Sequence, residues 1–397
     1  MAAHSPASPS AVLVELVPVA PRERVALIDI LRGMCLFGVL WSNLNDWYMT
    51  SDPVTPLDHA LRWTQDWLLE SRFYSMLGFL FGIGFAIQLT RAADRGRDVA
   101  ALFLRRMTIL LVLGVVHGLL IWFGDILHTY AFLGIALVLF RRLSPRKLVI
   151  AAATVWLLLP FLFTHIATAL HWSWPSFSYE HAAWVYSHGT WPQTVTEGAK
   201  QFLFMFWRWS LFTDPSFLAL FILGLWALKV DLITRLTRRR AFVLYGLSGA
   251  LVCWAAAQYL VLKINPSRSS ILFFLDDAAT WANSAVYALA FALLMSFPVV
   301  AKRLQPLAAL GRMTLTTYLV QSLVCITLFY HWGFGLMGKA NYTGMLLVTV
   351  VLFSLQIIFS MWWLKRFRFG PVEWLWRSLA YGKKLPNRFS PPASLAH

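Results

Sequence analysis

The sequence is poor in charged residues, which make up 13% of its 397 positions, whereas a typical soluble domain has about 25%. It has only three cysteines, Cys35, Cys253 and Cys325, and each lies inside an apolar run. Their placement excludes a disulfide framework and a cysteine metal site. The chain also lacks a Walker loop, a dinucleotide glycine fingerprint, an H-E-x-x-H motif and a G-x-S-x-G motif. These absences argue against soluble hydrolases, nucleotide-binding enzymes and small secreted scaffolds.

The residues that replace charge are apolar and aromatic: 59% of the chain is hydrophobic, with 20 Trp, 30 Phe and 12 Tyr. A helix needs roughly 20 apolar residues to cross about 30 Å of hydrocarbon, and such runs recur along the chain. We therefore expect an all-α, polytopic integral membrane helix bundle with about ten transmembrane helices. The predicted spans are 26–44, 73–90, 105–122, 126–140, 148–170, 212–228, 241–262, 272–299, 306–330 and 342–364.

The basic residues are distributed unevenly between the two sides of these spans. Of the 34 Lys and Arg residues, 26 lie in segments that share one side if the N-terminus is inside. Because such residues resist translocation, both termini are predicted in the cytoplasm of a bacterial plasma (inner) membrane. The lipid bilayer is then the expected partner, and the net charge of +16 requires no nucleic acid.

The sequence predicts one transmembrane domain, residues 22–380, between two disordered ends. Residues 1–21 are rich in Ala, Ser and Pro, and residues 381–397 form a predicted disordered cytoplasmic tail. Two long segments, 45–72 and 171–211, are expected as outer loops, and 201–211 could add a re-entrant piece.

The first span carries three polar residues, Asp29, Arg32 and Asn43, within about a 60° arc of one helical face. Ionisable groups inside a span are costly and usually face a bundle interior, so each is a functional candidate. The alternative is that Asp29 and Arg32 form an i,i+3 ion pair that holds the bundle together.

The third and fourth spans form the hairpin RRMTILLVLGVVHGLLIWFGDILHTYAFLGIALVLFRR. His117 is predicted near the middle of the membrane and Asp125 below the outer surface, at the hairpin tip. A carboxylate that orients a histidine is the recurring arrangement of a general base, although a lone histidine can also simply pack. His128 could compete for this role, but its position favours a hydrated structural histidine.

The ninth span, LGRMTLTTYLVQSLVC, begins beside Arg312 and carries a polar stripe that includes Thr317 and Gln321. These three residues are candidates for substrate contact, and hydrogen bonding between helices is an equally good explanation. Glycines in the second span and around His117 predict close helix packing. No metal-binding spacing is present.

Several of these motifs together resemble the YeiB-like bacterial membrane-protein family, a domain-of-unknown-function group (418). The resemblance rests on RVALIDILRGMCLFGVLWSN, GFLFGIGFAIQLTR, the hairpin, LGRMTLTTYLVQS and FRFGPVEWLWRSLAYG, and covers nearly the whole chain. That family is grouped with transmembrane acyltransferases, including the lysosomal heparan-glucosaminide acetyltransferase. The D-x-x-R-G start and outer Asn of that enzyme match Asp29, Arg32, Gly33 and Asn43. Its outer-loop histidine has no clear counterpart, since His59 lies in different surroundings.

The resemblance implies acyl transfer from a cytoplasmic donor, acyl-CoA, to an extracytoplasmic envelope or glycan acceptor, without a permanently bound cofactor. In the combined hypothesis His117 takes the acceptor proton, Asp125 orients His117, and Asn43 donates a hydrogen bond to the acyl oxygen. A rival hypothesis is a transporter or exporter of a small or lipidic solute, with Asp29, Arg32, His117 and Asp125 as a proton relay. A non-catalytic membrane partner protein is the third.

Overall fold

The computed structural model describes residues 26–48, 53–93, 100–171, 176–206, 215–264, 269–339 and 341–389. Within these ranges the chain is helical, and the one β contact is an isolated bridge between Phe367 and Arg388. The first helices are α1 (Ala26–Tyr48), α2 (Pro56–Thr64), the π-helix η2 (Gln65–Leu69), α3 (Arg72–Ala93), α4 (Ala100–Leu120), α5 (Leu127–Leu137), the 3-10 turn η3 (Val138–Phe140) and α6 (Pro145–Ala169). The others are α7 (Tyr179–His188), α8 (Trp191–Met205), α9 (Pro215–Lys229), α10 (Leu232–Arg238), α11 (Arg240–Lys263), α12 (Ser269–Met295), α13 (Pro298–Gly311), α14 (Thr314–Phe329), α15 (Tyr342–Leu364) and α16 (Pro371–Tyr381).

Seven helices of the described chain are long and apolar enough to cross a membrane. Two further apolar pairs, α9 with α10 and α13 with α14, are bent by 67° and 73°, and Leu127–Phe140 is a shorter apolar helix. All ten predicted spans therefore fall on apolar helices or bent pairs. The protein is a multi-pass, all-α membrane protein, as the composition predicts.

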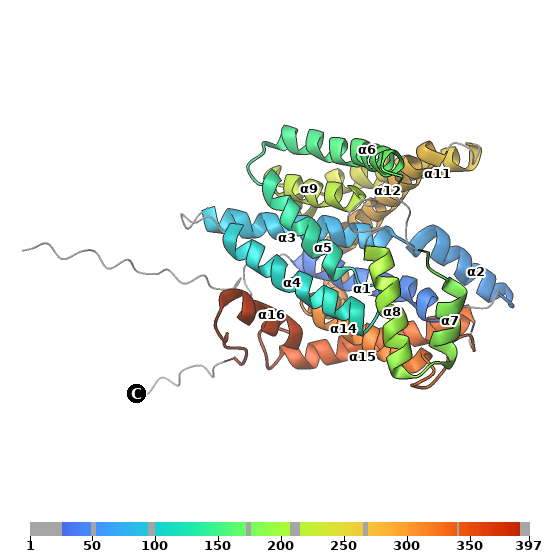
Figure 1. Ribbon diagram of the computed structural model, residues 1–397. Helices are drawn as coiled ribbons and strands as arrows, with labels where there is room; N and C mark the ends of the chain where they lie inside the picture. Colours follow the sequence, from blue (N-terminus) through green and yellow to red (C-terminus); the bar gives the residue numbers. More distant parts are fainter. Residues whose placement is uncertain are drawn as a thin grey trace, which may run out of the picture.

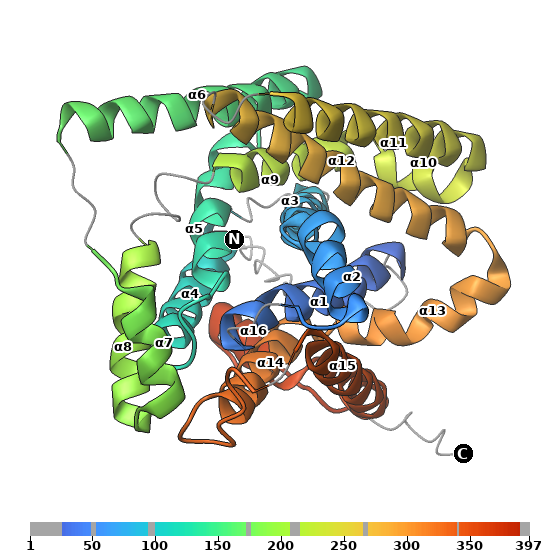
Figure 2. The ribbon, with the colours of Figure 1, turned by 90° about the vertical axis from the view of Figure 1, so that its right-hand side faces the viewer.

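α3, α4 and α15 run in roughly one direction, and α7 and α8 lie across it (Figure 1), whereas α6, α11 and α12 are inclined to it (Figure 2). Seen along the bundle, α1 and α3 occupy its middle, with α11 and α12 on one side and α14, α15 and α16 on the other (Figure 2). In its most apolar stretch, α1 is 78% buried whereas α11 is 11% buried. The polar residues of α1 therefore lie inside the protein, and α11 is left to face lipid. Cys253 on α11 is exposed, whereas Cys35 and Cys325 are buried.

Two pairs of glycines allow central helices to touch through their backbones. A Cβ atom at Gly33 of α1 would lie 2.1 Å from the Leu307 carbonyl oxygen. A Cβ atom at Gly311 of α13 would lie 1.8 Å from the backbone carbonyl oxygen of Asp29. Gly82 of α3 and Gly224 of α9 form a similar crossing. Lipid-exposed helices gain little from burying apolar surface against each other, so such close van der Waals contact is a main source of helix association in membranes. The predicted packing role of the second-span glycines is thus confirmed at Gly82.

The predicted ninth span, 306–330, was wrong as a single straight helix, because it consists of two helices that meet at a bend of 73°. α13 ends at Gly311, Arg312 and Met313 form the break, and α14 starts at Thr314. The break is stabilised by Glu373 of α16: Thr316 donates its backbone N–H to one carboxylate oxygen (2.9 Å) and its hydroxyl to the other (2.5 Å). A carboxylate at the first turn of a helix satisfies N–H groups that have no partner in the helix itself.

Glu373 provides a pH-dependent test of this contact. Burial raises the pKa of its carboxyl group, although the Thr316 hydrogen bonds act in the opposite direction. Above the ordinary glutamate pKa of about 4.3, the unfolded chain releases this proton before the folded chain does. The free energy of unfolding should therefore fall as the pH rises through that window, and Glu373→Gln should lose this component. Thermal unfolding in detergent should be measured at pH 4, 5.5 and 7. The unfolding midpoint of Glu373→Gln relative to that of the wild type should rise with pH, and the relative midpoint of the exposed control Glu180→Gln should stay constant. Parallel curves for Glu373→Gln and wild type would contradict the contact.

Segments expected to be irregular contain ordered elements. The predicted loop 45–72 holds α2 and the π-helix, and the predicted loop 171–211 holds α7 and α8. Thr190 and Gln193 form a capping box at the start of α8. This T-x-x-Q pattern is a helix-start signal, and it was missed because the segment was assigned as a loop from its length and composition. The predicted re-entrant piece, 201–211, falls partly on α8, and its residues 207–211 lie outside the described residues.

The predicted disordered tail begins too early. Asn387 accepts the Arg368 N–H at its backbone oxygen, and Trp374 donates its indole N–H to the Leu385 carbonyl, so the chain is held as far as these residues. Residues 1–21 and 390–397 lie outside the described residues.

Candidate functional site

The tip of the α4–α5 hairpin brings the two predicted catalytic residues together. α4 ends just after His117, whose carbonyl oxygen accepts the N–H groups of Ile121 and Trp122. The connecting residues then return so that His117 Nδ1 and Asp125 Oδ1 are 2.9 Å apart. Both side chains are almost completely buried. The predicted histidine–carboxylate pair is present in the structure.

Asp125 also binds a second histidine, which the sequence analysis misjudged. His128 places its Nδ1 2.9 Å from Asp125 Oδ2 and donates its backbone N–H to the same oxygen at 2.8 Å. It is 4% exposed and packs against Phe202 and Phe206, so it is not a hydrated surface residue. The reason is that residues 121–126 carry the start of α5 back against α4, below the level estimated from helical rise. The site is therefore a cluster of one carboxylate between two imidazoles, His117–Asp125–His128.

The two imidazoles of the cluster differ in the surroundings of Nε2, the ring nitrogen that does not contact Asp125. Because a carboxylate accepts from Nδ1–H, each Nε2 carries the lone pair if both rings are neutral. The Thr129 hydroxyl lies 3.3 Å from His128 Nε2. His117 Nε2 is buried and has no hydrogen-bond partner among the described residues. His117 is thus the member of the cluster that is placed to accept a proton.

Tyr318 of α14 fixes the hairpin tip from across the bundle. Its hydroxyl accepts the Ile126 N–H at 3.3 Å and donates to the Gly124 carbonyl at 3.4 Å. Its ring centre is 5.4 Å from that of His117. Tyr318 follows Thr317 in the polar stripe of the predicted ninth span, but the stripe alone does not indicate a contact with a segment almost two hundred residues away.

Gly114 and Gly118 allow close packing, as predicted. The partner of Gly114 is the hairpin tip itself, and the partner of Gly118 is a side chain of α8. A Cβ atom at Gly114 would lie 2.4 Å from the His128 backbone nitrogen and 2.7 Å from Asp125 Oδ2. At Gly118 it would meet the Phe202 ring of α8. The absence of side chains at these two positions is what allows the cluster and α8 to approach α4.

Gly114→Ala should therefore displace the cluster. The new methyl group has no room beside backbone atoms, and overpacking of this kind costs about 1–3 kcal/mol. The thermal unfolding midpoint should fall, and any cellular activity should be lost. The matched control is Gly249→Ala on α11, where no atom lies within 4 Å of the new carbon; it should be neutral or slightly stabilising. Equal midpoints for both variants would show that the hairpin is loosely packed.

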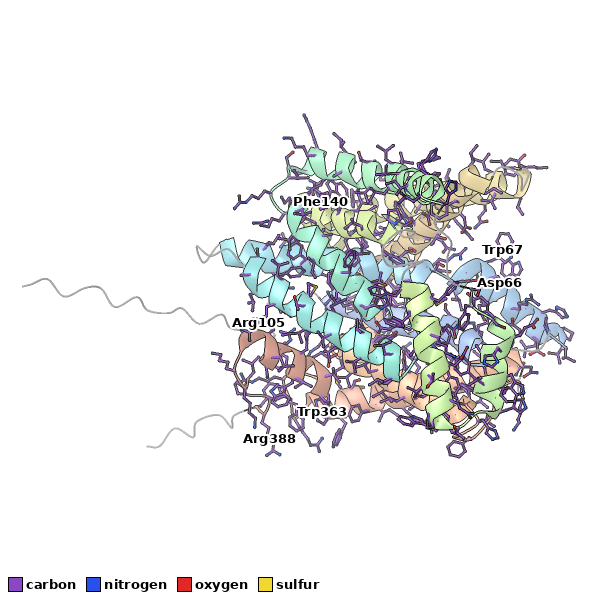
Figure 3. All side chains as sticks on the ribbon, in the orientation of Figure 1. Asp66, Trp67, Arg105, Phe140, Trp363 and Arg388 are labelled. Carbon is purple, nitrogen blue, oxygen red and sulfur yellow. The ribbon has the colours of Figure 1, made fainter. Side chains whose placement is uncertain are left out.

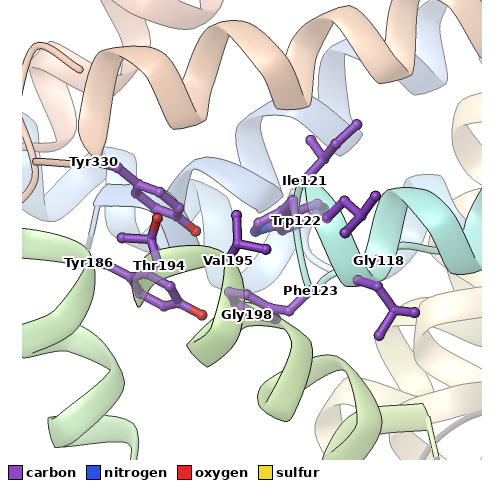
Figure 4. Close-up of a pocket in the computed structure, with 11 residues that line it drawn as sticks. Gly118, Ile121, Trp122, Phe123, Tyr186, Thr194, Val195, Gly198 and Tyr330 are labelled. Carbon is purple, nitrogen blue, oxygen red and sulfur yellow. The ribbon is translucent and has the colours of Figure 1, made fainter. Parts of the chain in front are cut away.

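A small, partly open pocket lies beside the end of α4, and Gly118 is the lining residue that comes next to His117 in the sequence. It lies between the end of α4, the hairpin tip and the α7–α8 pair (Figure 4). Its wall is mainly apolar, made of aliphatic and aromatic residues with two glycines, and Thr194 contributes a hydroxyl group. The lining residues are Gly118, Leu119, Leu120, Ile121, Trp122, Phe123, Tyr186, Thr194, Val195, Gly198 and Tyr330.

Asn43 is buried near the cluster but not in direct contact with it. Its Oδ1 accepts a hydrogen bond from the Tyr74 hydroxyl. Tyr74 in turn accepts the Tyr130 hydroxyl at its carbonyl oxygen (2.7 Å) and is within electrostatic range of Tyr318. Asn43 is thus linked to the cluster through a layer of tyrosines that the sequence analysis did not identify.

The remaining predicted residues form two separate groups. Near the N-terminal end of α1, Arg32 Nη1 and Asp29 Oδ1 are 3.9 Å apart, and Arg32 donates to the Leu80 carbonyl at 3.3 Å. Arg312 occupies the α13–α14 break, next to the Gly33–Gly311 crossing.

The second group connects α14 with α15. Gln321 donates its amide to Gln356 Oε1 at 3.0 Å, and Gln356 donates to the Thr317 carbonyl at 3.2 Å. This arrangement matches the hydrogen-bonding explanation of the stripe. Gln356 was missed because a single amide in an apolar run gives little signal.

One further buried polar contact was missed. Asp277 of α12 accepts the Trp156 indole N–H (3.0 Å) and the Ser216 hydroxyl (2.6 Å) at the same oxygen, Oδ2. Two adjacent aspartates inside a predicted span, Asp276 and Asp277, were the available signal. Within the described residues, no group of three His, Cys, Asp or Glu side chains is arranged to hold a metal ion.

Comparison with known proteins gives relatives over nearly the whole chain. Residues 224–383 match the family described as "Protein of unknown function (DUF418)". The chain is 30% identical to "Uncharacterized protein YxaH" of Bacillus subtilis (strain 168), over 92% of this chain and 96% of that protein. It is 28% identical to "Uncharacterized 39.9 kDa protein in amylase 3'region" of Bacillus acidopullulyticus, over 93% and 97%. It is also 28% identical to "Uncharacterized protein YeiB" of Escherichia coli (strain K12), over 90% and 96%. No solved structure gives a significant match.

Proposed function

The chain belongs to the YeiB-like DUF418 family, and for this member we propose a membrane-embedded acyltransferase that moves an acyl group from cytoplasmic acyl-CoA to an extracytoplasmic acceptor hydroxyl. The proposed location is the bacterial inner membrane, with both termini in the cytoplasm. The observation that carries the proposal is the His117–Asp125 pair, in which Nδ1 is bound to the carboxylate and Nε2 has no partner among the described residues. That is the geometry of a general base with its orienting acid.

The transfer proceeds by attack of the acceptor hydroxyl oxygen on the thioester carbonyl carbon. His117 Nε2 takes the hydroxyl proton as the new C–O bond forms, and Asp125 stabilises the resulting imidazolium. The C–S bond then breaks, and the imidazolium returns the proton to the departing CoA thiolate. Atoms and electrons balance without an oxidant, a metal or an external base.

Asn43 has the secondary role of stabilising charge on the acyl oxygen. Since its Oδ1 accepts from Tyr74, its amide N–H groups are the part that can donate to an oxyanion. The acceptor approaches His117 from the side of α7 and α8, where Gly118 borders a small pocket that must widen to admit it. The donor approaches from the opposite side, where Arg32 and Arg312 lie.

The test uses the full chain in liposomes with acyl-labelled acetyl-CoA on the cytoplasmic side and a bacterial envelope extract on the outer side. The proposal expects acceptor-dependent release of free CoA thiol and label in a covalent product. Movement of unmodified label across the membrane without thiol release would refute the enzyme and support the rival transporter. Inverted vesicles distinguish the orientations, because only one side should accept the donor.

A further inference from the structure

Arg106, in the second turn of α4, is a buried cation. It is 6% exposed, and its guanidinium lies 4.6 Å above the Trp376 ring of α16. Nη1 donates to Gln88 Oε1 at 2.5 Å, and the buried Nε has no hydrogen-bond partner among the described residues. Trp376 also donates its indole N–H to the Arg106 carbonyl at 2.8 Å. α16 therefore covers this arginine.

The charge of Arg106 is only partly compensated by these contacts. A buried ion costs several kcal/mol unless it is paired, and one amide oxygen with one aromatic face is weaker than a carboxylate. The arginine–carboxylate pairs found in the described chain involve Arg32 and Arg62 instead. The environment of Arg106 is therefore suited to an anion that the protein itself does not supply.

Other cations gather beside Arg106 at the same end of the molecule. Arg105 is exposed, and its guanidinium lies next to Gly382, at the end of α16. Lys383 and Lys384 follow and are exposed, and Tyr381 is within electrostatic range of Arg106. Figure 3 places Arg105 at the end where Trp363 and Arg388 also lie, and Asp66 and Trp67 at the other end. About 9 Å of helical rise separates Arg106 from the start of α4, so Arg106 lies close to one end of this helix.

We propose that Arg105, Arg106, Lys383 and Lys384 form a phosphate-binding site between α4 and the end of α16. A phosphate has several oxygens, so it can accept from a planar guanidinium and from flexible ammonium groups together. The phosphate comes either from a CoA molecule or from an anionic phospholipid of the adjoining leaflet. The site stands without the transfer reaction, and only CoA as a source rests on the proposed function.

The experiment measures binding to the purified full chain with three probes: inorganic pyrophosphate, coenzyme A without an acyl group, and nanodiscs containing phosphatidylglycerol or only phosphatidylcholine. The main variant is Lys383→Gln with Lys384→Gln, because both side chains are exposed and the fold should persist. The matched control is Arg235→Gln with Arg238→Gln, an exposed pair on α10. Arg106→Gln is the second variant, and thermal unfolding establishes that each protein is folded.

The lysine variant should weaken binding at least tenfold, and the α10 control should not. Loss of coenzyme A and pyrophosphate binding identifies a soluble phosphate ester as the source. Loss of phosphatidylglycerol retention alone, by native mass spectrometry, identifies the lipid. Arg106→Gln should unfold at or above the wild-type temperature without ligand, but gain no thermal shift from the bound probe. The proposal would be wrong if the wild type bound neither pyrophosphate nor coenzyme A and bound phosphatidylglycerol no better than phosphatidylcholine. It would also be wrong if the lysine variant bound the probes as tightly as the α10 control.

Discussion

His117→Gln is expected to leave the protein folded and to lower transfer activity about 10²–10⁴-fold, the usual contribution of a positioned general base. Glutamine retains a donor for the Asp125 carboxylate and has similar bulk, so the hairpin tip should persist. It cannot accept and return a proton near neutral pH. Thiol release from acetyl-CoA and complementation of a deletion strain measure the loss.

The matched control for this substitution is His59→Gln. His59 lies on α2, is exposed, and belongs to the segment 45–72 that is predicted to be an outer loop. His59→Gln should keep full activity. A folded His117→Gln protein with wild-type thiol release would remove the catalytic assignment, and a loss in His59→Gln instead would move the base to α2.

Asp125→Asn is expected to reduce both activity and stability, which differs from the effect of His117→Gln. Both carboxylate oxygens accept hydrogen bonds, from His117 Nδ1 on one side and from the Nδ1 and backbone N–H of His128 on the other. An amide can replace only one oxygen, so its NH₂ group must face a donor. An unsatisfied buried donor costs about 1–3 kcal/mol, and the thermal unfolding midpoint should fall accordingly.

Asp277→Asn is the control for this second prediction. Trp156 and Ser216 both donate to Asp277 Oδ2, so the amide oxygen can take that position while the NH₂ group replaces the other oxygen. Its unfolding midpoint should stay near that of the wild type. Equal destabilisation of the two variants would show that the hydrogen bonds to both oxygens of Asp125 contribute no more to the free energy of unfolding than those to one oxygen of Asp277.

The sequence was sufficient to predict contacts that form within one hairpin or one helix. Asp29 and Arg32 are three residues apart on one helix, and His117 and Asp125 are eight apart on one tight hairpin, so short separation along the chain keeps each pair close. The apolar runs likewise identified the spans, because the hydrocarbon thickness sets their length.

Contacts between distant segments could not be predicted in this way. Tyr318 reaches the hairpin tip, and Glu373 reaches the start of α14, only because the bundle brings these helices together. The bend between α13 and α14 falls at Arg312 and Met313, next to Gly311, and these residues were assigned to a single span because apolar residues flank them on both sides. His128 was misjudged because helical rise cannot describe the return of residues 121–126.

The bridging position of Asp125 has a consequence for the charge of the buried cluster. With the carboxylate ionised and both imidazoles neutral, the three side chains carry one negative charge in a region of low polarity. Uptake of one proton by His117 makes the cluster neutral overall, so the proton-accepting step discharges the site rather than charging it. Opposite charges a few ångströms apart attract more strongly in such a region than in water. The second imidazole spreads the initial negative charge over more hydrogen bonds, and in the proposed transfer the cluster would become neutral when it takes the acceptor's proton.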